Sequence, residues 1–261
     1  MDRCPDDLVA FAHRLADAAA AVQRRWYRQD PPVTIKPDGS PVTVADKEAE
    51  RALRALLAAT HPDHGIVGEE EPPHRADAEW VWVFDPIDGT KDFVAGKPVF
   101  GTLIALAHNG RPVLGVIDQA IVGDRWVGAD GHGTRLNGAP VRVRACATIA
   151  EAIVSTSGPG DYAKAVDAEL ARVRRGARWL RFGADCVNYG LVAAGLMDVV
   201  ADAGLDAHDF AALDAVVRNA GGRFSDWSGR AITLKSDGRV LATGDGRVHA
   251  EALARIADRA G

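Results

Sequence analysis

Cysteine is scarce in this chain, which has three in 261 residues. Cys4, Cys146 and Cys186 are an odd number at irregular spacing, which fits reduced thiols better than a disulfide framework or a zinc site. Long apolar runs are also absent, because none approaches the roughly 20 residues that a membrane-spanning helix needs. Residues 1–7 are acidic and contain no apolar signal core. These absences predict reduced thiols, no membrane partner and a cytoplasmic location.

The chain also lacks an excess of positive charge. Its formal net charge is −5 and no basic stripe is present, which argues against a nucleic-acid partner. The densest basic run, residues 172–181 with five arginines, fits a solvated helix end and loop better than an anion site. Hydrophobic residues make up 47% of the chain and charged residues 26%, a balance typical of a globular protein.

The order of patterns along the chain predicts an α/β protein with two subdomains, 1–145 and 146–261, and no flexible linker between them. The first subdomain begins with amphipathic helices at about 6–27 and 46–60, and its runs 101–107 and 112–118 form a hairpin. The second alternates strands and helices. The other predicted strands are 66–71, 80–84, 125–129, 141–144, 152–156, 178–182 and 197–201, and the later helices are 185–195, 210–219 and 248–256.

The most informative stretch is Asp85-Pro86-Ile87-Asp88-Gly89-Thr90, which follows the apolar run 80–84. A buried strand that ends in two carboxylates carries a cost of several kcal/mol unless a cation offsets it. A strand end followed by a helix start is also a good place for a phosphate, and Gly89 lets backbone N–H groups approach one. The stretch therefore predicts metal-assisted phosphate chemistry.

Three other acidic positions follow apolar residues or begin a helix. Asp46 alone could be a helix cap, Glu69–Glu71 a solvated acidic turn, and His208-Asp209 a pair that satisfies helix-start donors. Together with residues 85–88 they provide the oxygen ligands that Mg²⁺ prefers. Two such ions suit in-line displacement at phosphorus, in which one activates water and the other stabilises the leaving oxygen. Thr90 bonded to Asp46 would orient that water and accept its proton.

These residues match a known family. The motifs Gly68-Glu69-Glu70, residues 85–90, and Asp209-x-Ala211-Ala212 running into Ala220-Gly221-Gly222 occur in order, and the chain resembles the inositol monophosphatase superfamily over nearly its whole length. The resemblance implies a layered α-β-α-β-α sandwich of the inositol monophosphatase/fructose-1,6-bisphosphatase type. It also implies a homodimer, and an Mg²⁺-dependent, Li⁺-sensitive phosphatase with two or three ions.

The resemblance also implies roles for individual residues. Metal would be held by Glu69, Asp85, the Ile87 carbonyl, Asp88 and Asp209, with Glu70 near a weaker metal. Thr90 and Asp46, with Glu69, would activate water, Lys36 would lie in a mobile loop, and the substrate would contact Asp88, Gly89, Thr90, Asp185, Asp202 and Asp209.

The branch of the family is predicted from the run 181–186 and from Phe224-Ser225-Asp226-Trp227, which resemble histidinol-phosphate phosphatases. Histidinol phosphate carries an ammonium and an imidazole, so its pocket needs anions beyond the metal ligands, and Asp185 and Asp202 could supply them. Asp185 could equally be a helix N-cap, and Asp202 a turn residue.

Two positions depart from the expected pattern. His208 stands where the family usually has Trp or Tyr, and Lys91 resembles the branch that cleaves nucleotide 3'-phosphates. The leading hypothesis is hydrolysis of L-histidinol phosphate to L-histidinol and phosphate. The alternatives are inositol-1-monophosphatase, then fructose-1,6-bisphosphatase or nucleotide 3'-phosphatase, and, in a different class, a non-catalytic ligand-binding homologue.

Overall fold

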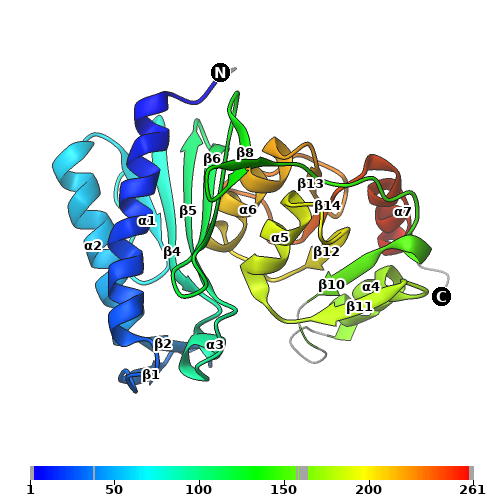
Figure 1. Ribbon diagram of the computed structural model, residues 1–261, viewed down its shortest axis with the longest axis horizontal. Coiled ribbons are helices and arrows are strands. Elements are labelled where there is room, and N and C mark those ends of the chain that lie inside the picture. The colour runs from blue at the N-terminus through cyan, green and yellow to red at the C-terminus, as the bar shows by residue number, and fades with distance from the viewer. Residues whose placement is uncertain (1–2, 38, 157, 159–163, 259–261) are drawn as a thin grey trace.

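A computed structural model describes residues 3–37, 39–156, 158 and 164–258 (Figure 1). The helices are α1 (Asp6–Trp26), α2 (Val44–Thr60), α3 (Thr90–Val94), the 3₁₀ helix η1 (Ile149–Glu151), α4 (Lys164–Arg174), α5 (Asp185–Ala193), α6 (Ala207–Asn219) and α7 (Gly246–Ala257). The strands are β1 (Val33–Ile35), β2 (Pro41–Thr43), β3 (Gly65–Gly68), β4 (Trp80–Asp88), β5 (Gly101–His108), β6 (Arg111–Gln119), β7 (Asp124–Ala129), β8 (Gly133–Leu136), β9 (Ala139–Val141), β10 (Ile153–Thr156), β11 (Trp179–Phe182), β12 (Val199–Asp202), β13 (Arg223–Asp226) and β14 (Val240–Thr243).

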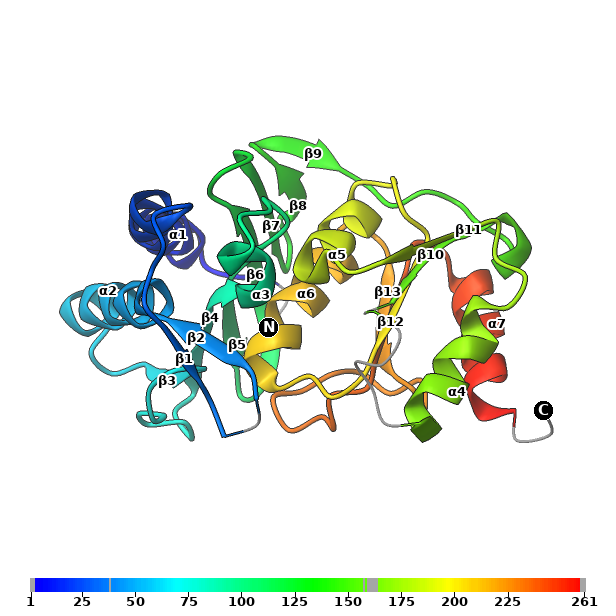
Figure 2. The same cartoon turned by 90° about the horizontal axis from the view of Figure 1, so that it is seen from below.

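The elements form five layers, which Figure 2 shows from left to right. Helices α1 and α2 cover one face of a sheet ordered β3-β4-β5-β6-β7-β8-β9, and α5 and α6 cover its other face. A second sheet, ordered β11-β10-β12-β14-β13, follows, and α4 and α7 lie outside it. The predicted α-β-α-β-α sandwich is confirmed.

Strand β4 explains how one sheet can be buried on both faces. Its successive side chains point in opposite directions. Val81 and Val83 join the core between the two sheets, whereas Trp82 and Phe84 join the core under α1 and α2. A strand covered by helices on both sides therefore reads as a continuous apolar run instead of an alternating one.

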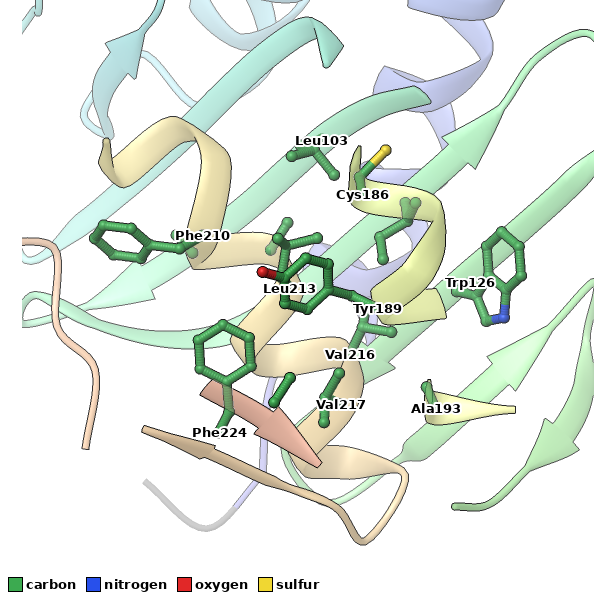
Figure 3. Close-up of a cluster of buried hydrophobic side chains, with 14 of the residues drawn as sticks. Leu103, Trp126, Cys186, Tyr189, Ala193, Phe210, Leu213, Val216, Val217 and Phe224 are labelled. Atoms are coloured by element: carbon green, nitrogen blue, oxygen red, sulfur yellow. The ribbon is translucent and has the colours of Figure 1, made fainter. Parts of the chain in front are cut away.

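The core between the sheets is the larger of these two (Figure 3). Tyr189 of α5 and Phe210 and Leu213 of α6 pack there with Leu103 of the first sheet and Phe224 of the second. Helix α6 thus belongs to the later part of the chain but packs on the sheet built by the earlier part. The division at residues 145 and 146 separates the two sheets along the chain, yet both sheets share this core.

Most predicted elements are confirmed with shifts of a few residues at their ends, including the β5–β6 hairpin. The predicted strand 141–144 is wrong in position, because β9 spans Ala139–Val141 and residues 142–144 lie outside it. The predicted strand 80–84 is too short, since β4 continues to Asp88 through an irregularity in its pairing. The prediction missed the three-residue strands β1 and β2, the four-residue strands β8, β13 and β14, the 3₁₀ helix η1 and the helix α4.

The cysteine prediction is confirmed, because Cys4, Cys146 and Cys186 are all free and buried. Within the described ranges, no helix has the length and apolar character that crossing a bilayer would require.

Candidate active site

The candidate site lies where β4 ends, beside the first turns of α2, α5 and α6. A β-bulge shapes this end of β4. Asp85 pairs with Leu103 and Asp88 pairs with Gly101, so that two residues of β4, Pro86 and Ile87, oppose the single residue Thr102 of β5. In an unbroken strand, positions i and i+3 point to opposite faces. The extra residue resets the alternation, and both carboxylates therefore lie on the α5/α6 face.

The bulge brings three carboxylates together. One oxygen each from Asp85, Asp88 and Asp209 lies within 4.8 Å of the others. Burial, and then the charges of neighbouring acids, raise the pKa of Asp85 and of Asp88 well above their ordinary range. The pKa of Asp209 rises to about 6, because burial and the charge of Glu69 outweigh the opposing effect of His208. Like charges at this distance are unfavourable unless a cation lies among them.

The donor set suits a hard divalent cation. All three groups present oxygen, and the Ile87 carbonyl, which accepts a hydrogen bond from Thr90 Oγ1, lies in the same turn. Oxygen-only donors favour Mg²⁺ over zinc or copper, which prefer nitrogen or sulfur. The backbone N–H of Cys186, at the start of α5, donates to Asp88 Oδ2 at 2.7 Å, and Ile87 N–H donates to Asp85 Oδ1 at 3.0 Å. These bonds leave each carboxylate one oxygen directed elsewhere, so the residues present fit the ion.

Lys36 lies beside the predicted second part of the metal site. Its Nζ donates to Glu69 Oε1 at 2.7 Å and to Glu70 Oε1 at 2.8 Å. Burial lowers the pKa of Lys36, but the two carboxylates outweigh burial and raise it. Burial raises the pKa of Glu70 to about 7. The β1–β2 hairpin thus places an ammonium where these two glutamates require positive charge.

Thr90 and Asp46 are also in contact. Thr90 Oγ1 lies 3.2 Å from Asp46 Oδ1 and 3.0 Å from the Ile87 carbonyl oxygen. Asp46 belongs to a capping box at the start of α2, in which it accepts a bond from the backbone N–H of Thr43 at 2.8 Å. Burial raises the pKa of the Asp46 carboxyl. The N-cap of α2 is therefore Thr43 and not Asp46, which occupies the third position of the helix, and Asp46 also contacts Thr90.

Gly89 lies close to the carboxylate of Asp185. Gly89 has a φ of +90°, and a Cβ there would lie 3.0 Å from Asp185 Oδ2. Ala184 and Asp185 also have positive φ values, of 70° and 34°. Such backbone costs of order 1–3 kcal/mol per residue and concentrates at functional sites. The strained turn places the Asp185 carboxylate beside Asp88, whose pKa it raises.

Asp202 and His208 lie differently. Asp202 is buried at the end of β12, and its Oδ2 accepts a bond from Tyr189 Oη at 2.7 Å. His208 Nε2 lies 3.6 Å from Asp209 Oδ1. The histidine therefore acts on the electrostatics of a predicted metal ligand, and the contact of Asp202 with substrate stays a prediction.

The comparison with protein-family models decides the classification. The model of the inositol monophosphatase family matches residues 5–261. The chain belongs to this family. Its members are metal-dependent phosphatases, and the acidic cluster of this chain agrees with that chemistry. The chain is accordingly a phosphoric monoester hydrolase.

Relatives within the inositol monophosphatase family carry more than one activity in their names. A chloroplastic bifunctional phosphatase of Arabidopsis thaliana is 40% identical over 95% of this chain and 74% of its own length. A histidinol-phosphatase of Mycobacterium tuberculosis is 36% identical over 96% of this chain and 98% of its own. The solved structure of an inositol monophosphatase from Zymomonas mobilis superposes with a TM-score of 0.88 at 42% identity, covering 96% of this chain and 98% of that one.

One supporting residue of this family member was missed from the sequence. Glu50 on α2 is fully buried, and its carboxylate accepts the backbone N–H groups of Glu70 at 2.8 Å and Glu71 at 3.1 Å. A Cβ on Gly68 would lie 2.2 Å from Glu50 Oε1, so any larger residue at this position would displace the Glu50 carboxylate. Glu50 lies on the buried face of α2 with Asp46 and Leu53, and an acid on that face is the only signal for it in the sequence, because its partners lie 20 positions away.

Proposed function

We propose that this phosphatase hydrolyses L-histidinol phosphate to L-histidinol and phosphate with the help of Mg²⁺. One observation carries the choice of substrate: the backbone around Asp185 is strained, and it holds a carboxylate at the rim of an already acidic site. An additional anion there is unfavourable for a neutral polyol but attracts a cationic substrate. The name of the Mycobacterium tuberculosis relative supports the same choice.

The residues of the chain divide the work among them. Glu69, Asp85, the Ile87 carbonyl, Asp88 and Asp209 are proposed to hold the metal, which supplies an acidified water and neutralises charge on the leaving oxygen. Thr90, bonded to Asp46, orients the attacking water, and the buried Asp46 carboxylate takes its proton. Glu69 is proposed to assist in activating this water. Gly89 leaves room for the phosphate, because any side chain would meet Asp185.

The number of ions follows from the two groups of acids. The residues 85, 88 and 209 form one group, and Glu69 and Glu70 form a second beside Lys36. We therefore propose two or three Mg²⁺ ions, with Glu70 near the weakest and Lys36 in a loop that moves when this ion enters. Li⁺ is expected to inhibit by competing there. Titration of activity with Mg²⁺ and Li⁺ tests both statements; one hyperbolic Mg²⁺ dependence without Li⁺ inhibition would contradict them.

Specificity constants for histidinol phosphate, inositol 1-phosphate, fructose 1,6-bisphosphate and a nucleotide 3'-phosphate test the substrate. Asp185→Asn is expected to lower kcat/KM for histidinol phosphate about 10- to 100-fold, which is the value of a hydrogen bond to a charged group, and to change inositol 1-phosphate little. Asp202→Asn tests the second proposed substrate anion in the same way. Asp63→Asn removes the same charge from a side chain that is 90% exposed and serves as the control. Equal losses on both substrates would contradict the cation-binding role.

Inositol-1-monophosphatase activity is the second candidate. The likeness to the Zymomonas mobilis inositol monophosphatase favours it, at 42% identity and a TM-score of 0.88. A higher specificity constant for inositol 1-phosphate than for histidinol phosphate would establish it. Phosphate release that does not exceed background with any of the four substrates would instead indicate a ligand-binding homologue without catalysis.

We further propose a cytoplasmic homodimer. Three free cysteines suit a reducing compartment. Strand β11 is an edge strand with three exposed apolar side chains, Trp179 (51% exposed), Leu180 and Phe182, and a second copy of the chain is the proposed occupant. Sedimentation velocity measures the state, and Trp179→Lys is expected to give monomers. A monomeric wild type at micromolar concentration would overturn the proposal.

A further inference from the structure

Pro86 is one of the two extra-paired residues of the β4 bulge, and its carbonyl group is held by hydrogen bonds from side chains. Proline has no N–H, so this residue can enter the β-ladder only through its oxygen. That oxygen points away from the acidic cluster, toward α1. It accepts bonds from Gln23 Nε2 at 2.7 Å and from Thr102 Oγ1 at 3.0 Å. Pro86 is therefore held by side chains and not by a second strand.

Gln23 and Thr102 form a small buried network on that face. Both side chains have an exposed fraction of 0%. Gln23 Nε2 lies 2.5 Å from Thr102 Oγ1 as well as 2.7 Å from the Pro86 oxygen, so the amide bridges the bulge and the opposing residue of β5. The orientation of the amide is fixed by this pattern, because its oxygen in the same place would face another acceptor.

Burying the polar side chain of Gln23 lowers the stability that α1 gains from packing on the sheet. Gln23 lies in the buried stripe of this helix, where Leu15 and Ala19 are apolar. Its Oε1 is buried and has no hydrogen-bond partner among the described residues. A leucine or methionine would fill this position without a buried polar group. The hydrogen bonds that offset this unfavourable burial are made outside the helix, to Pro86 and Thr102 at the bulge.

We propose that Gln23 and Thr102 are positioning residues that set the geometry of the metal donors from the opposite face of the first sheet. They touch neither metal nor substrate. By holding the Pro86 carbonyl they fix the peptide that joins Pro86 to Ile87, whose N–H donates to Asp85 Oδ1, and with it the face on which Asp88 lies. Helix α1 would thus control a site from which the sheet separates it. The inference rests on the proposed metal site.

Mn²⁺ binding to the substrate-free protein, followed by electron paramagnetic resonance, tests this directly. Gln23→Met keeps the length of the side chain and removes the donor. It is expected to weaken Mn²⁺ binding about 10-fold, as loss of a group that orients a ligand does. The Mg²⁺ concentration for half-maximal activity should rise by the same factor, while KM for the phosphate ester at saturating Mg²⁺ stays near the wild-type value.

Controls separate positioning from stability. Leu15→Met changes packing in the same stripe without reaching the bulge and is expected to leave Mn²⁺ affinity unchanged. Thr102→Val should reproduce the effect of Gln23→Met, and Thr102→Ser, which keeps the hydroxyl, should restore binding. Thr102→Val decides the matter if Gln23→Met does not fold.

Two results would overturn the inference. If Mn²⁺ affinity stays within twofold of wild type in both Gln23→Met and Thr102→Val, these residues contribute only to packing and do not position the metal donors. Equal weakening in Thr102→Ser and Thr102→Val would remove the hydroxyl from the argument. A wild-type protein that binds no Mn²⁺ would overturn the metal site itself, which is a different failure.

Discussion

Two regions of this protein bury carboxylates in opposite ways. At the end of β4, Asp85, Asp88 and Asp209 face one another, and their pKa values are raised. Around the second sheet, each buried acid has its own partners. Asp198 binds Arg144 through both oxygens, at 2.7 and 2.6 Å, and also accepts Ile153 N–H.

Asp226 follows the same rule as Asp198. Burial acts to raise its pKa, but bonds from Ser228 and Arg230 outweigh burial and lower it. In the second region each of these two buried carboxylates is paired with an arginine of the same chain. In the first region the negative charge of the three carboxylates is left for a bound cation to balance. Buried acids with internal partners stabilise the fold, and buried acids without them indicate what the site binds.

The largest expected effect is on activity and comes from substituting a carboxylate of the cluster at the end of β4. Asp88→Asn removes one negative charge and keeps an acceptor for Cys186 N–H. Because several kcal/mol of charge stabilisation are lost, kcat/KM should fall on the order of 1000-fold or more. Stability in chelator should stay constant or rise, since repulsion is relieved. Thermal unfolding and steady-state kinetics measure both, and a marked loss of stability would contradict the comparison.

Breaking the second set should have the reverse outcome. Asp198→Ala leaves Ile153 N–H without its acceptor and removes both bonds to the Arg144 side chain, which is 40% exposed, so the expected loss of stability is about 2 kcal/mol. Urea unfolding should show this loss, while kcat of the remaining folded enzyme is unchanged. Arg247→Ala, at an exposed pair with Asp245, provides a control with a much smaller effect. A fall in kcat as large as that of Asp88→Asn would show that the two regions are not separate.

A pH-dependent effect of intermediate size is expected from His249 in the second region. Its ring lies between Ser225 and Thr243, and burial lowers its pKa to about 4. The unfolded chain takes up this proton near pH 6.5, so stability is fully present above that pH and is lost as the pH falls toward 4. At pH 5.5 the loss is about 1.4 kcal/mol. The free energy of unfolding is measured against pH for the wild type and for His249→Gln, and the difference between the two curves gives the contribution of His249. Identical curves would show that folding does not lower the pKa of this ring.

The smallest effect is expected where the first region does have an internal support. Glu50→Gln keeps one acceptor for the Glu70 and Glu71 N–H groups but loses the charge that faces Arg54, at a cost of about 1 kcal/mol. The Mg²⁺ concentration for half-maximal activity should rise about fivefold. Arg51→Gln, on the exposed side of α2, is the matched control. No shift in Mg²⁺ dependence would mean that the turn holds its shape without Glu50.

Local patterns in the sequence predicted most helices and strands and the acidic cluster, whereas the order of the layers was implied by the resemblance to the inositol monophosphatase superfamily. Strand β4 is apolar on both faces, α1 has a continuous apolar stripe, and residues 85–90 contain two acids around a proline. Among the missed strands, β8 and β13 consist mostly of polar residues and glycine, so no apolar run marks them, although β10 and β12 of the same four-residue length were predicted. The arginines of 172–181 concealed the end of α4, because charge hides the apolar positions between them, whereas β11 within the same run was predicted as the strand 178–182.

Supporting residues could not be predicted from their own neighbourhoods. Gln23 and Pro86 are 63 positions apart, and Glu50 and Glu70 are 20 apart, so only the folded arrangement shows why a polar group lies on an apolar stripe. The bulge was also beyond prediction, since two acids at i, i+3 are equally consistent with a tight turn. The strand assignment ended at Phe84 for that reason.

The bulge has a consequence for how this site can change over evolutionary time. Orientation along a strand has a parity, odd or even, and Asp88 shares a face with Asp85 only because one residue too many lies between them. Substitutions within β4 preserve that parity, whereas deleting a single residue between the two acids would turn Asp88 toward α1 with every reactive side chain still present. Length in this segment is thus under stricter constraint than identity, and a homologue with one residue fewer here would have lost the reaction before losing any catalytic residue.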